Sequence, residues 1–445
     1  MRWMWPGLTM DQAVFKEREY KEDGYMNGLK PFLDNMTSCP AEKYFRKIIR
    51  DWGDKYVIPY RRQYDEDWKD HKFIGPAFKA LLVDLGFQKS MFPPEYGGWN
   101  LGQSDFAARL SAVIFEEVSR FDAGMAVALG VVFWPFMIIT WKPHIHSKLC
   151  DEFAPMYMRD DKPMFGMVAM TEPQGGSDIE NLDVLGGSTI KTTAVLDGDE
   201  WVINGHKLWP TNSGGVADLI GVICTTKPGS DDEKDLAYIF VPADTPGVTQ
   251  GNPYEKAGMA SDKNSDIWFE DVRVPSWYRP WGPGLDALYF RGVLTIGMLS
   301  PGFSIGPMLN VYEILYDFCS KKTLNGKPLK EHDAIAGELA EIVTGIETSR
   351  ALYYRFAYML DHPQEYGWRW APEILARGRL AKNFIADRCI KDCERAMEIM
   401  GTYGADRQWD IEKHWRDLKM GQLYEGGKQL ALMDTARPYF DCKTL

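Results

Sequence analysis

The sequence predicts an α+β fold in which two helical regions enclose a β domain. Apolar residues recur at helical spacing from Ala41, short runs of β-branched and aromatic residues begin near Met164, and helical spacing returns after Pro283. These changes of period divide the 445 residues into four parts. The parts are an N-terminal extension (1–40), a helical domain (41–162), an antiparallel β domain (163–282) and a C-terminal helical domain (283–445).

The first helical domain is predicted from amphipathic segments. Ile48 and Trp52 lie one helical turn apart, and Pro76 occupies the first turn of a second helix, where proline is tolerated. The stretch 104–121 continues the pattern, and its acidic pair Glu116-Glu117 is expected on the exposed face.

The next segment, 123–140, contains eighteen residues without a charge. Its length barely reaches that of a membrane span, and Gly130 and Pro135 interrupt it. We therefore interpret it as a buried core helix.

Later segments follow from the same patterns. Five strands are expected at 164–170, 190–196, 219–226, 237–241 and 265–269. Asp197-Gly198-Asp199 and Asn204-Gly205 fall between the strands, and Asn-Gly is the strongest short signal for a hairpin turn. The acidic stretch 230–235 is expected at a solvated hairpin tip. Long amphipathic helices are expected over 333–360 and 371–400, ended by Gly401 and Gly404.

Composition and charge exclude several classes of protein. An apolar share of 45% with 13% aromatic residues excludes a disordered chain. The net charge of −12 argues against a nucleic-acid-binding protein, because phosphate binding requires a basic face. Seven scattered cysteines, no signal-peptide pattern and no cluster at metal-ligand spacing indicate reduced thiols, a cytoplasmic location and no metal site.

Near the C-terminus, one carboxylate lies between an aromatic ring and two glycines, in Leu423-Tyr424-Glu425-Gly426-Gly427. When a substrate displaces water from such a group, desolvation raises its pKa toward the range of a proton-abstracting base. Glu425 is therefore a candidate general base. The alternative is a solvated glutamate in a glycine loop that ends a helix.

Several stretches resemble, in order, the signature motifs of the acyl-CoA dehydrogenase family. They are 93–98 (PPEYGG), 169–178 (AMTEPQGGSD), 201–212 (WVINGHKLWPTN), 269–275 (FEDVRVP) and 412–427 around Glu425. The resemblance runs from about residue 45 to 437. It implies an N-terminal helical domain, a middle antiparallel β-barrel-like domain, a C-terminal four-helix bundle, and FAD-dependent dehydrogenation of an acyl-CoA thioester.

The chemistry itself requires a cofactor, because α,β-dehydrogenation needs a base, hydrogen bonds to the enolate oxygen and a hydride acceptor. No Gly-x-Gly-x-x-Gly opens a βαβ unit, so the usual dinucleotide fold is excluded. The resemblance instead implies FAD contacts from Met170, Thr171, Gly176, Ser177, Trp209 and Thr211. An ordinary turn cluster, and a core tryptophan beside a hairpin threonine, are the alternatives.

By the same resemblance, Glu425 is the base and the Gly426 amide binds the thioester oxygen. Some members carry the base just before an arginine at the start of the third domain, where this chain has Phe290 before Arg291. Arg291 is expected to support the base loop, with a salt-bridged helix arginine as the alternative. The expected substrate contacts are Ser177, Tyr96, Ala126, Phe290, Arg291 and Tyr424.

The resemblance further implies FAD binding across a subunit interface, in a homodimer or homotetramer. The residues concerned are Lys321, Thr323, Glu398, Gly401, Gly427 and Gln429. Glu398 stands where the family often has Gln, and Gly427 where it often has Thr. A glutamate beside a pyrophosphate is repelled unless protonated or turned away, which makes a modified subunit contact an open alternative.

The acyl group is expected to be uncharged, because no arginine follows Arg120-Phe121-Asp122, where members acting on dicarboxylic acyl groups carry one. Small residues such as Ala126, together with Trp134, Phe136 and Tyr96, favour a wide pocket for a cyclic or branched acyl group. Tight helix packing explains small residues equally well. Electrons are expected to pass to an electron-transfer flavoprotein or a similar acceptor. An oxidase or enoyl-CoA reductase of the same fold, and a catalytically silent acyl-CoA-binding or assembly paralogue, stay open.

Overall fold

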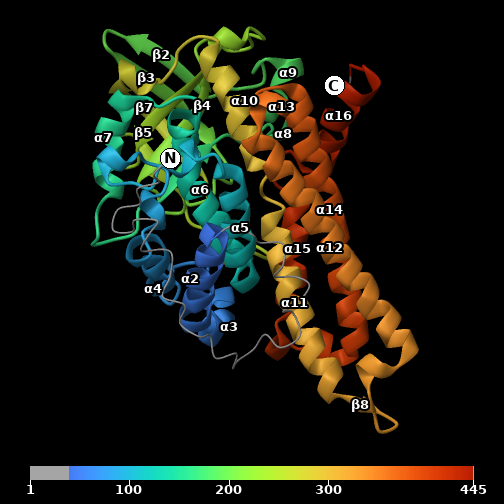
Figure 1. Ribbon diagram of the computed structural model, residues 1–445. Helices are drawn as coiled ribbons and strands as arrows, with labels where there is room; N and C mark the ends of the chain where they lie inside the picture. Colours follow the sequence, from blue (N-terminus) through green and yellow to red (C-terminus); the bar gives the residue numbers. More distant parts are fainter. Residues whose placement is uncertain (1–39, 444–445) are drawn as a thin grey trace.

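The computed structural model describes residues 40–443, so the predicted extension at 1–40 lies almost wholly outside the described residues (Figure 1). The region after it is helical, as predicted. Its helices are α2 (Pro40–Tyr56), α3 (Arg61–Glu66), α4 (Gly75–Lys79), α5 (Ala107–Phe121), α6 (Ala123–Thr140) and α7 (Ser147–Tyr157).

A curled sheet follows, with its strands in the order β1-β4-β2-β3-β7-β6 and β5 paired to β4. The strands are β1 (Gly166–Ala169), β2 (Thr193–Asp197), β3 (Glu200–Lys207), β4 (Leu219–Thr225), β5 (Leu236–Pro242), β6 (Val248–Gln250) and β7 (Ile267–Pro275). Most pairs are antiparallel, but β1 and β2 each pair with β4 in parallel. The sheet is therefore mixed, where the sequence pattern predicted antiparallel pairing throughout.

The predicted hairpin at Asn204-Gly205 is wrong, because both residues lie inside β3. The other predicted break, Asp197-Gly198-Asp199, is confirmed: β2 turns into β3 there, with Asp197 and Glu200 as register partners. Pairing between β3 and β7 shifts between Ile203 and Gly205, and a Cβ on Gly205 would lie 2.4 Å from the Thr192 hydroxyl oxygen. Glycine thus serves close packing at a β-bulge rather than a turn.

The C-terminal region is again helical, and its long helices lie side by side on the right of Figure 1. They are α10 (Leu285–Gly297), α11 (Gly302–Lys321), α12 (Asp333–Asp361), α14 (Pro372–Met400), α15 (Ile411–Gly421) and α16 (Gly427–Phe440). Between them lie the short hairpin β8 (Thr323–Leu324) and β9 (Lys327–Pro328) and the short helix α13 (Pro363–Tyr366). Helix α14 ends at Gly401, whose φ is +59°, so the prediction of that boundary is confirmed.

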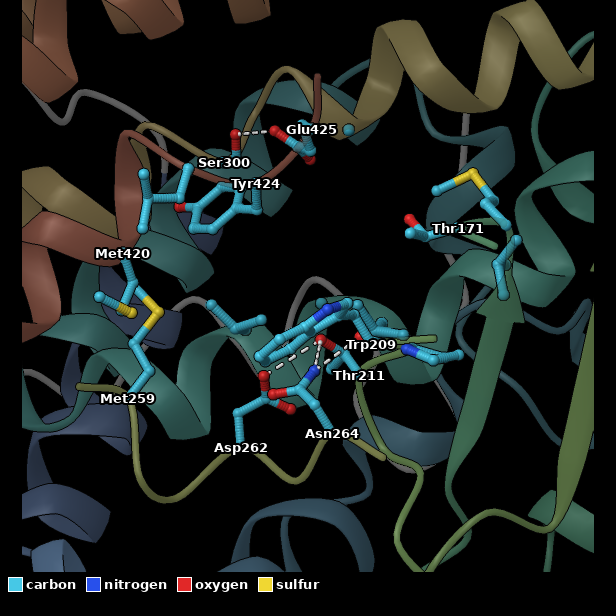
Figure 2. Close-up of a pocket in the computed structure, with 18 of the residues that line it drawn as sticks. Thr171, Trp209, Thr211, Met259, Asp262, Asn264, Ser300, Met420, Tyr424 and Glu425 are labelled. Carbon is cyan, nitrogen blue, oxygen red and sulfur yellow. Dashed lines mark hydrogen bonds between the residues drawn. The ribbon is translucent and has the colours of Figure 1, made fainter. Parts of the chain in front are cut away.

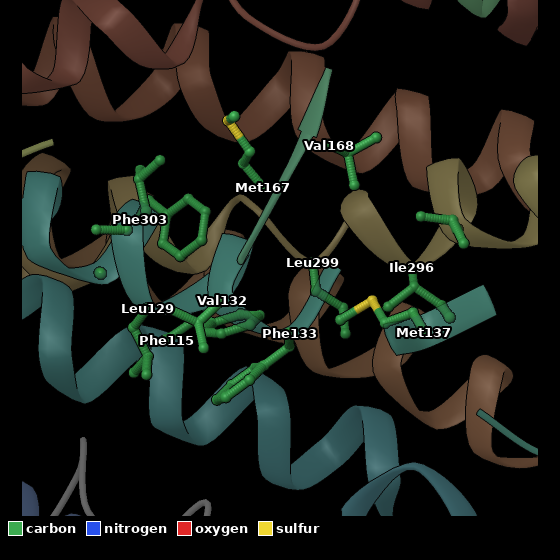
Figure 3. Close-up of a cluster of buried hydrophobic side chains, with 14 of the residues drawn as sticks. Phe115, Leu129, Val132, Phe133, Met137, Met167, Val168, Ile296, Leu299 and Phe303 are labelled. Atoms are coloured by element: carbon green, nitrogen blue, oxygen red, sulfur yellow. The ribbon is translucent and has the colours of Figure 1, made fainter. Parts of the chain in front are cut away.

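The uncharged helix α6 belongs to the core that joins the three regions. Figure 3 shows its Leu129, Val132 and Phe133 beside Met167 of β1 and Phe303 of α11. Within the described residues, α6 and the segment Leu285–Lys321 are long and apolar enough to span a membrane, but 94% and 100% of those windows are buried. The prediction of a core helix at 123–140 is confirmed.

Glu116 and Glu117 correct the sequence analysis, because both are fully buried rather than exposed. Glu116 accepts from Arg350 Nε and Nη2 of α12, each at 3.0 Å, and from Arg46 Nη1 of α2 at 2.9 Å. Glu117 accepts from Arg50 Nε at 2.9 Å and is also paired with Arg46. Burial alone would raise the pKa of both carboxyls, but the arginines outweigh it and hold both pKa values below their usual range.

Replacing Arg350 by methionine should lower the free energy of unfolding by about 3–5 kcal/mol, because Glu116 would stay buried with one cationic partner fewer. Urea unfolding of the purified protein measures this change. The control Arg273→Met removes a half-exposed pair with Asp197 and Glu200 and should cost less than about 1 kcal/mol. Equal losses in the two variants would contradict a structural role for the buried network.

Candidate active site

A cavity of about 660 Å³ lies where the two helical regions and the β domain meet. One half is apolar and is formed by side chains of α5, α6, α10 and α11, among them Phe115, Val127, Trp134, Met137, Ile296 and Phe303. The other half is polar and includes Thr171, Thr211, Asp262, Asn264, Ser300 and Glu425. Figure 2 shows Glu425 and Trp209 on opposite sides of this space.

Residues from three separate motifs meet at the cavity. The predicted site residues that line it are Met170, Thr171, Gly176, Ser177, Trp209, Thr211, Tyr424, Glu425 and Gly426. They come from the loop after β1, the loop after β3, and the loop between α15 and α16. Stretches more than two hundred residues apart in sequence therefore form one site.

Trp209 and Thr211 form the wall opposite Glu425. Trp209 has a φ of +65° and is 52% exposed, and its ring lies 4.3 Å from that of Tyr254. Thr211 Oγ1 donates to Asp262 Oδ2 at 3.1 Å and accepts from Asn264 Nδ2 at 3.3 Å. A large indole left open beside a fixed hydroxyl is suited to a planar ligand.

Asp262 and Asn264 were not found by sequence reasoning, because nothing in the stretch 262–264 marks it as facing Thr211. Burial raises the pKa of Asp262, although Lys256 Nζ at 3.3 Å opposes this effect. Asp262 Oδ1 has no hydrogen-bond partner among the described residues. Such an orphaned buried oxygen can accept a hydrogen bond from a bound ligand.

A buried ion pair between Lys207 and Glu172 holds the loop that carries Thr171. Lys207 Nζ donates to Glu172 Oε1 at 2.7 Å and to the Met170 carbonyl at 2.8 Å. Burial alone would raise the pKa of Glu172. The charge of Lys207 and hydrogen bonds from Lys207 and Thr192 outweigh it and lower the pKa to about 2. A Cβ on Gly176 would lie 2.9 Å from Thr171 Oγ1, so a bare backbone is needed at this turn.

Glu425 is half-buried, and its carboxylate lies among Ser300, Gly297 and Trp134. Ser300 Oγ donates to Glu425 Oε2 at 2.6 Å, and an added Cβ on Gly297 would lie 3.1 Å from Oε1. Burial raises the pKa of Glu425 to about 7, with Lys382 and the Ser300 hydrogen bond acting in the opposite direction. The alternative of a solvated loop glutamate does not fit this environment.

Two further cations hold the loop 423–427 and were missed by sequence reasoning. Lys382 donates to the Tyr424 carbonyl, and Arg379 donates to the Glu425 carbonyl. Both lie on α14, more than forty residues before the loop, and no local signal links them to it.

Arg291 was expected to support this loop, and the structure corrects that expectation. Arg291 Nε donates to Asp183 Oδ1 at 2.6 Å, and its Nη1 donates to Glu233 Oε2 at 3.0 Å. It is the salt-bridged helix arginine of the alternative interpretation. Its partner Glu233 lies in the acidic turn between β4 and β5, where Asp231 and Asp232 are exposed as predicted.

Other predicted substrate contacts also lie outside the cavity lining. Phe290 and Ala126 are fully buried, and Tyr96 donates its hydroxyl to Asp151 Oδ1 at 2.8 Å. Phe136, expected in the pocket, packs on Phe92 with ring centroids 4.6 Å apart. The motifs predicted the neighbourhood of these residues but not the direction of their side chains. Of the aromatic residues expected at the acyl group, Trp134 and Tyr424 line the cavity, whereas Tyr96, Phe136 and Phe290 do not.

The residues expected to reach a neighbouring subunit's FAD do not line this cavity. Lys321, Thr323, Glu398 and Gly401 are exposed where α11 and α14 end, and Tyr403 packs on Phe318 there at 5.5 Å. This end of the bundle carries the β8 label in Figure 1. Gln429 is exposed on α16, and Gly427 begins that helix with a φ of +60°. Their role toward a second subunit stays a prediction.

Family models of three successive domains match the chain in order. They are acyl-CoA dehydrogenase N-terminal domain over residues 40–141, middle domain over 167–272 and C-terminal domain over 297–439. The chain belongs to the acyl-CoA dehydrogenase family. It is therefore an oxidoreductase of a flavoprotein family, and FAD is its cofactor.

Curated relatives match over nearly the whole chain. Cyclohex-1-ene-1-carbonyl-CoA dehydrogenase of Syntrophus aciditrophicus (strain SB) is 28% identical over 411 residues, which cover 91% of each protein. Cyclohexane-1-carbonyl-CoA dehydrogenase of the same organism is 28% identical over 89% of this chain and 94% of its own. The solved structure of butyryl-CoA dehydrogenase from Megasphaera elsdenii has a TM-score of 0.76 at 23% identity, covering 91% of this chain and 99% of that one.

The residues of the cavity fit FAD. The exposed Trp209 indole offers an aromatic face, and Thr171, Thr211 and the orphaned Asp262 oxygen offer polar groups at its edge. The glycine turn at Gly176 offers bare backbone for a phosphate. The remaining apolar half leaves room for an acyl group next to Glu425.

Gly297→Ala should slow flavin reduction by acyl-CoA at least about tenfold, because small displacements of catalytic groups are costly. The new Cβ would lie 3.1 Å from Glu425 Oε1 and 2.7 Å from Trp134 Cζ2. Stopped-flow absorbance measures the rate, and bound FAD should be unchanged. Gly337→Ala in α12 is the matched control, since its Cβ meets nothing within 4 Å. Equal rates in the two variants would show that the close packing of Gly297 against Glu425 and Trp134 does not affect flavin reduction.

Proposed function

We propose that this enzyme oxidises an uncharged acyl-CoA thioester to the α,β-enoyl-CoA, with Glu425 as the base that removes the α-proton. The observation that carries the proposal is the position of Glu425: its carboxylate is largely desolvated at one side of the cavity and faces Trp209 across it (Figure 2). Such a group is ionised near neutral pH and, once desolvated, is a strong enough base for a thioester α-proton.

The chain's own residues would then act as follows. FAD, when bound, supplies the acceptor for the β-hydride. Met170, Thr171, Trp209 and Thr211 would hold its ring, and Gly176 and Ser177 its pyrophosphate. The Gly426 N–H donates to no backbone carbonyl among the described residues, so it is available to the thioester oxygen. Glu425 takes the α-proton, and Ser300 keeps its carboxylate oriented.

The apolar half of the cavity supports an uncharged acyl group. Phe115, Trp134 and Phe303 line it, and the one cation among the described lining residues, Lys256, lies on the polar side beside Asp262. A carboxylate at the end of the acyl chain would have no partner there. The relatives named for cyclohexane-type substrates make a ring-containing acyl group the substrate class that we propose.

Electrons would leave the reduced enzyme for an electron-transfer flavoprotein or a similar acceptor. We also propose that the enzyme is a homodimer or homotetramer, because Lys321, Thr323, Glu398 and Gly401 are exposed at the end of the bundle, away from the chain's own cavity. These four positions are those that the family resemblance assigns to the neighbouring subunit's cofactor.

The rate of flavin reduction under anaerobic conditions should rise about tenfold per pH unit below pH 7 and level off above it, because the base must be ionised to accept the proton and its pKa is about 7. Stopped-flow bleaching of the flavin with saturating acyl-CoA measures this profile. Glu425→Gln should bind FAD and acyl-CoA but fail to bleach at any pH. Normal bleaching by that variant would refute the assignment of the base.

A panel of thioesters tests the acyl group. Cyclohexane-1-carbonyl-CoA should give a kcat/KM about tenfold or more above that of butyryl-CoA, because the ring fills more of the apolar half. Glutaryl-CoA should not bleach the flavin, since its second carboxylate would be buried without a partner. Efficient turnover of glutaryl-CoA would show that the proposed substrate class is wrong. It would not contradict the assignment of Glu425 as the base.

A further inference from the structure

Three successive carbonyls of the base loop accept hydrogen bonds from side chains outside the loop. Lys382 donates to Tyr424 O, Arg379 donates to Glu425 O, and Ser177 Oγ donates to Gly426 O at 3.2 Å. Lys382 also lies 3.4 Å from Glu425 O. The loop is thus held from α14 on one side and from the helix α8 (Ser177–Glu180) on the other.

The backbone that these contacts hold is strained. Glu425, Gly426 and Gly427 have φ values of +50°, +71° and +60°. A left-handed conformation is accessible to glycine but costs a glutamate about 1 kcal/mol or more, and it persists only where the surroundings enforce it. The enforcing contacts at Glu425 are the cations of α14.

The two cations differ in how their charge is compensated. Arg379 is fully buried and has a carboxylate on each side: Glu180 Oε2 at 2.8 Å from Nη2, and Asp434 Oδ2 at 3.0 Å from Nε. Lys382 is 4% exposed and, within residues 40–443, forms no ion pair; its ammonium contacts carbonyls and lies 5.1 Å from the centre of the Tyr424 ring. Its positive charge is therefore the less compensated of the two.

We propose that Arg379 and Lys382 are positioning residues for Glu425 with separate roles: Arg379 holds the base loop in its left-handed conformation, and Lys382 keeps the carboxylate ionised at working pH. The inference rests on the proposed function of Glu425 and adds to it. The physical reason is that a buried cation held at the backbone of the base loop, in a poorly hydrated site, favours the ionised form of the carboxylate on that loop.

The other groups around Glu425 are consistent with this division. Lys382 and Arg379 face it from α14, Glu180 from α8 and Ser300 from the junction of α10 and α11. Burial raises the pKa of Glu425, and Lys382 is the strongest influence that lowers it, ahead of Ser300 and Arg379. Burial in turn lowers the pKa of Lys382 to about 8, with Glu425 as the strongest opposing charge.

The test of Lys382 is the pH profile of flavin reduction in the holoenzyme variants Lys382→Met and Lys382→Arg. Removing the charge should move the midpoint for Glu425 up by about one pH unit, so that the rate at pH 6 falls about tenfold and recovers at alkaline pH. Lys382→Arg should restore most of the original midpoint. A merely structural lysine would lower the rate at every pH and leave the midpoint in place, and that result would overturn its role.

Arg379→Lys tests the other role, because it keeps the charge but loses the fork that joins Glu180, Asp434 and the Glu425 carbonyl. The rate should fall about tenfold or more at all pH values with an unshifted midpoint. FAD content and melting temperature show whether the variant is folded. A shifted midpoint with an unchanged limiting rate would overturn the separation of roles.

A readout that does not depend on turnover is the melting temperature as a function of pH. Because burial raises the pKa of Glu425 above its ordinary 4.5, the folded state binds this proton more tightly, and Glu425→Gln should gain stability relative to wild type as pH rises through 7. In the Lys382→Met background that gain should continue to higher pH, because the pKa of Glu425 in the folded state would be raised further. An inactive Glu425→Gln with an unmoved Lys382→Met midpoint defeats only this inference, whereas an active Glu425→Gln defeats the proposed function.

Discussion

The contact between α5 and the C-terminal helices is the constraint on which the shape of the cavity depends. Phe115 of α5 lines the cavity, and the next residue, Glu116, is locked to Arg350 of α12. One turn later, Ser119 Oγ donates at 2.7 Å to the Gly302 carbonyl, where α11 begins. Breaking a buried ion pair leaves an uncompensated charge, so α5 has a single stable position. The place of Phe115 in the apolar half of the cavity is therefore set by the position of α5.

Inside this fixed space, the ionisable group of the proposed base Glu425 is a source of instability. The pKa of Glu425 is about 7 in the folded chain and 4.5 in its ordinary state, so the folded state binds more protons between these values. Stability from this group is therefore complete below about pH 4.5 and is lost as pH rises through 7. If Glu425 is the base, as we propose, this loss of stability accompanies a reactive carboxylate, a common compromise at active sites.

Local patterns were sufficient for the helical regions and most of the strands, because periodicity is a property of neighbouring residues. The family motifs marked nine of the residues that line the cavity, but not Asp262, Asn264 or Ser300. Features that depend on distant partners were not accessible. Glu116 looks exposed until Arg46 and Arg350, 70 and 234 residues away, are placed beside it. Likewise, Asn204-Gly205 reads as a turn until the packing of Gly205 on Thr192 is known.

The loop that carries Glu425 is held by a different arginine from the one that the sequence predicted. The guanidinium of Arg291 is occupied by Asp183 and Glu233, and it therefore docks α10 onto the β domain. Arg379 takes the loop carbonyl instead, and its partner Glu180 ends the helix that Ser177 begins. Because Ser177 also donates to Gly426 O, the loop that carries Glu425 and the turn at Gly176 are connected at two points. The proposed base and the proposed phosphate site are thus positioned by one shared helix, and we expect a shift in either to move the other.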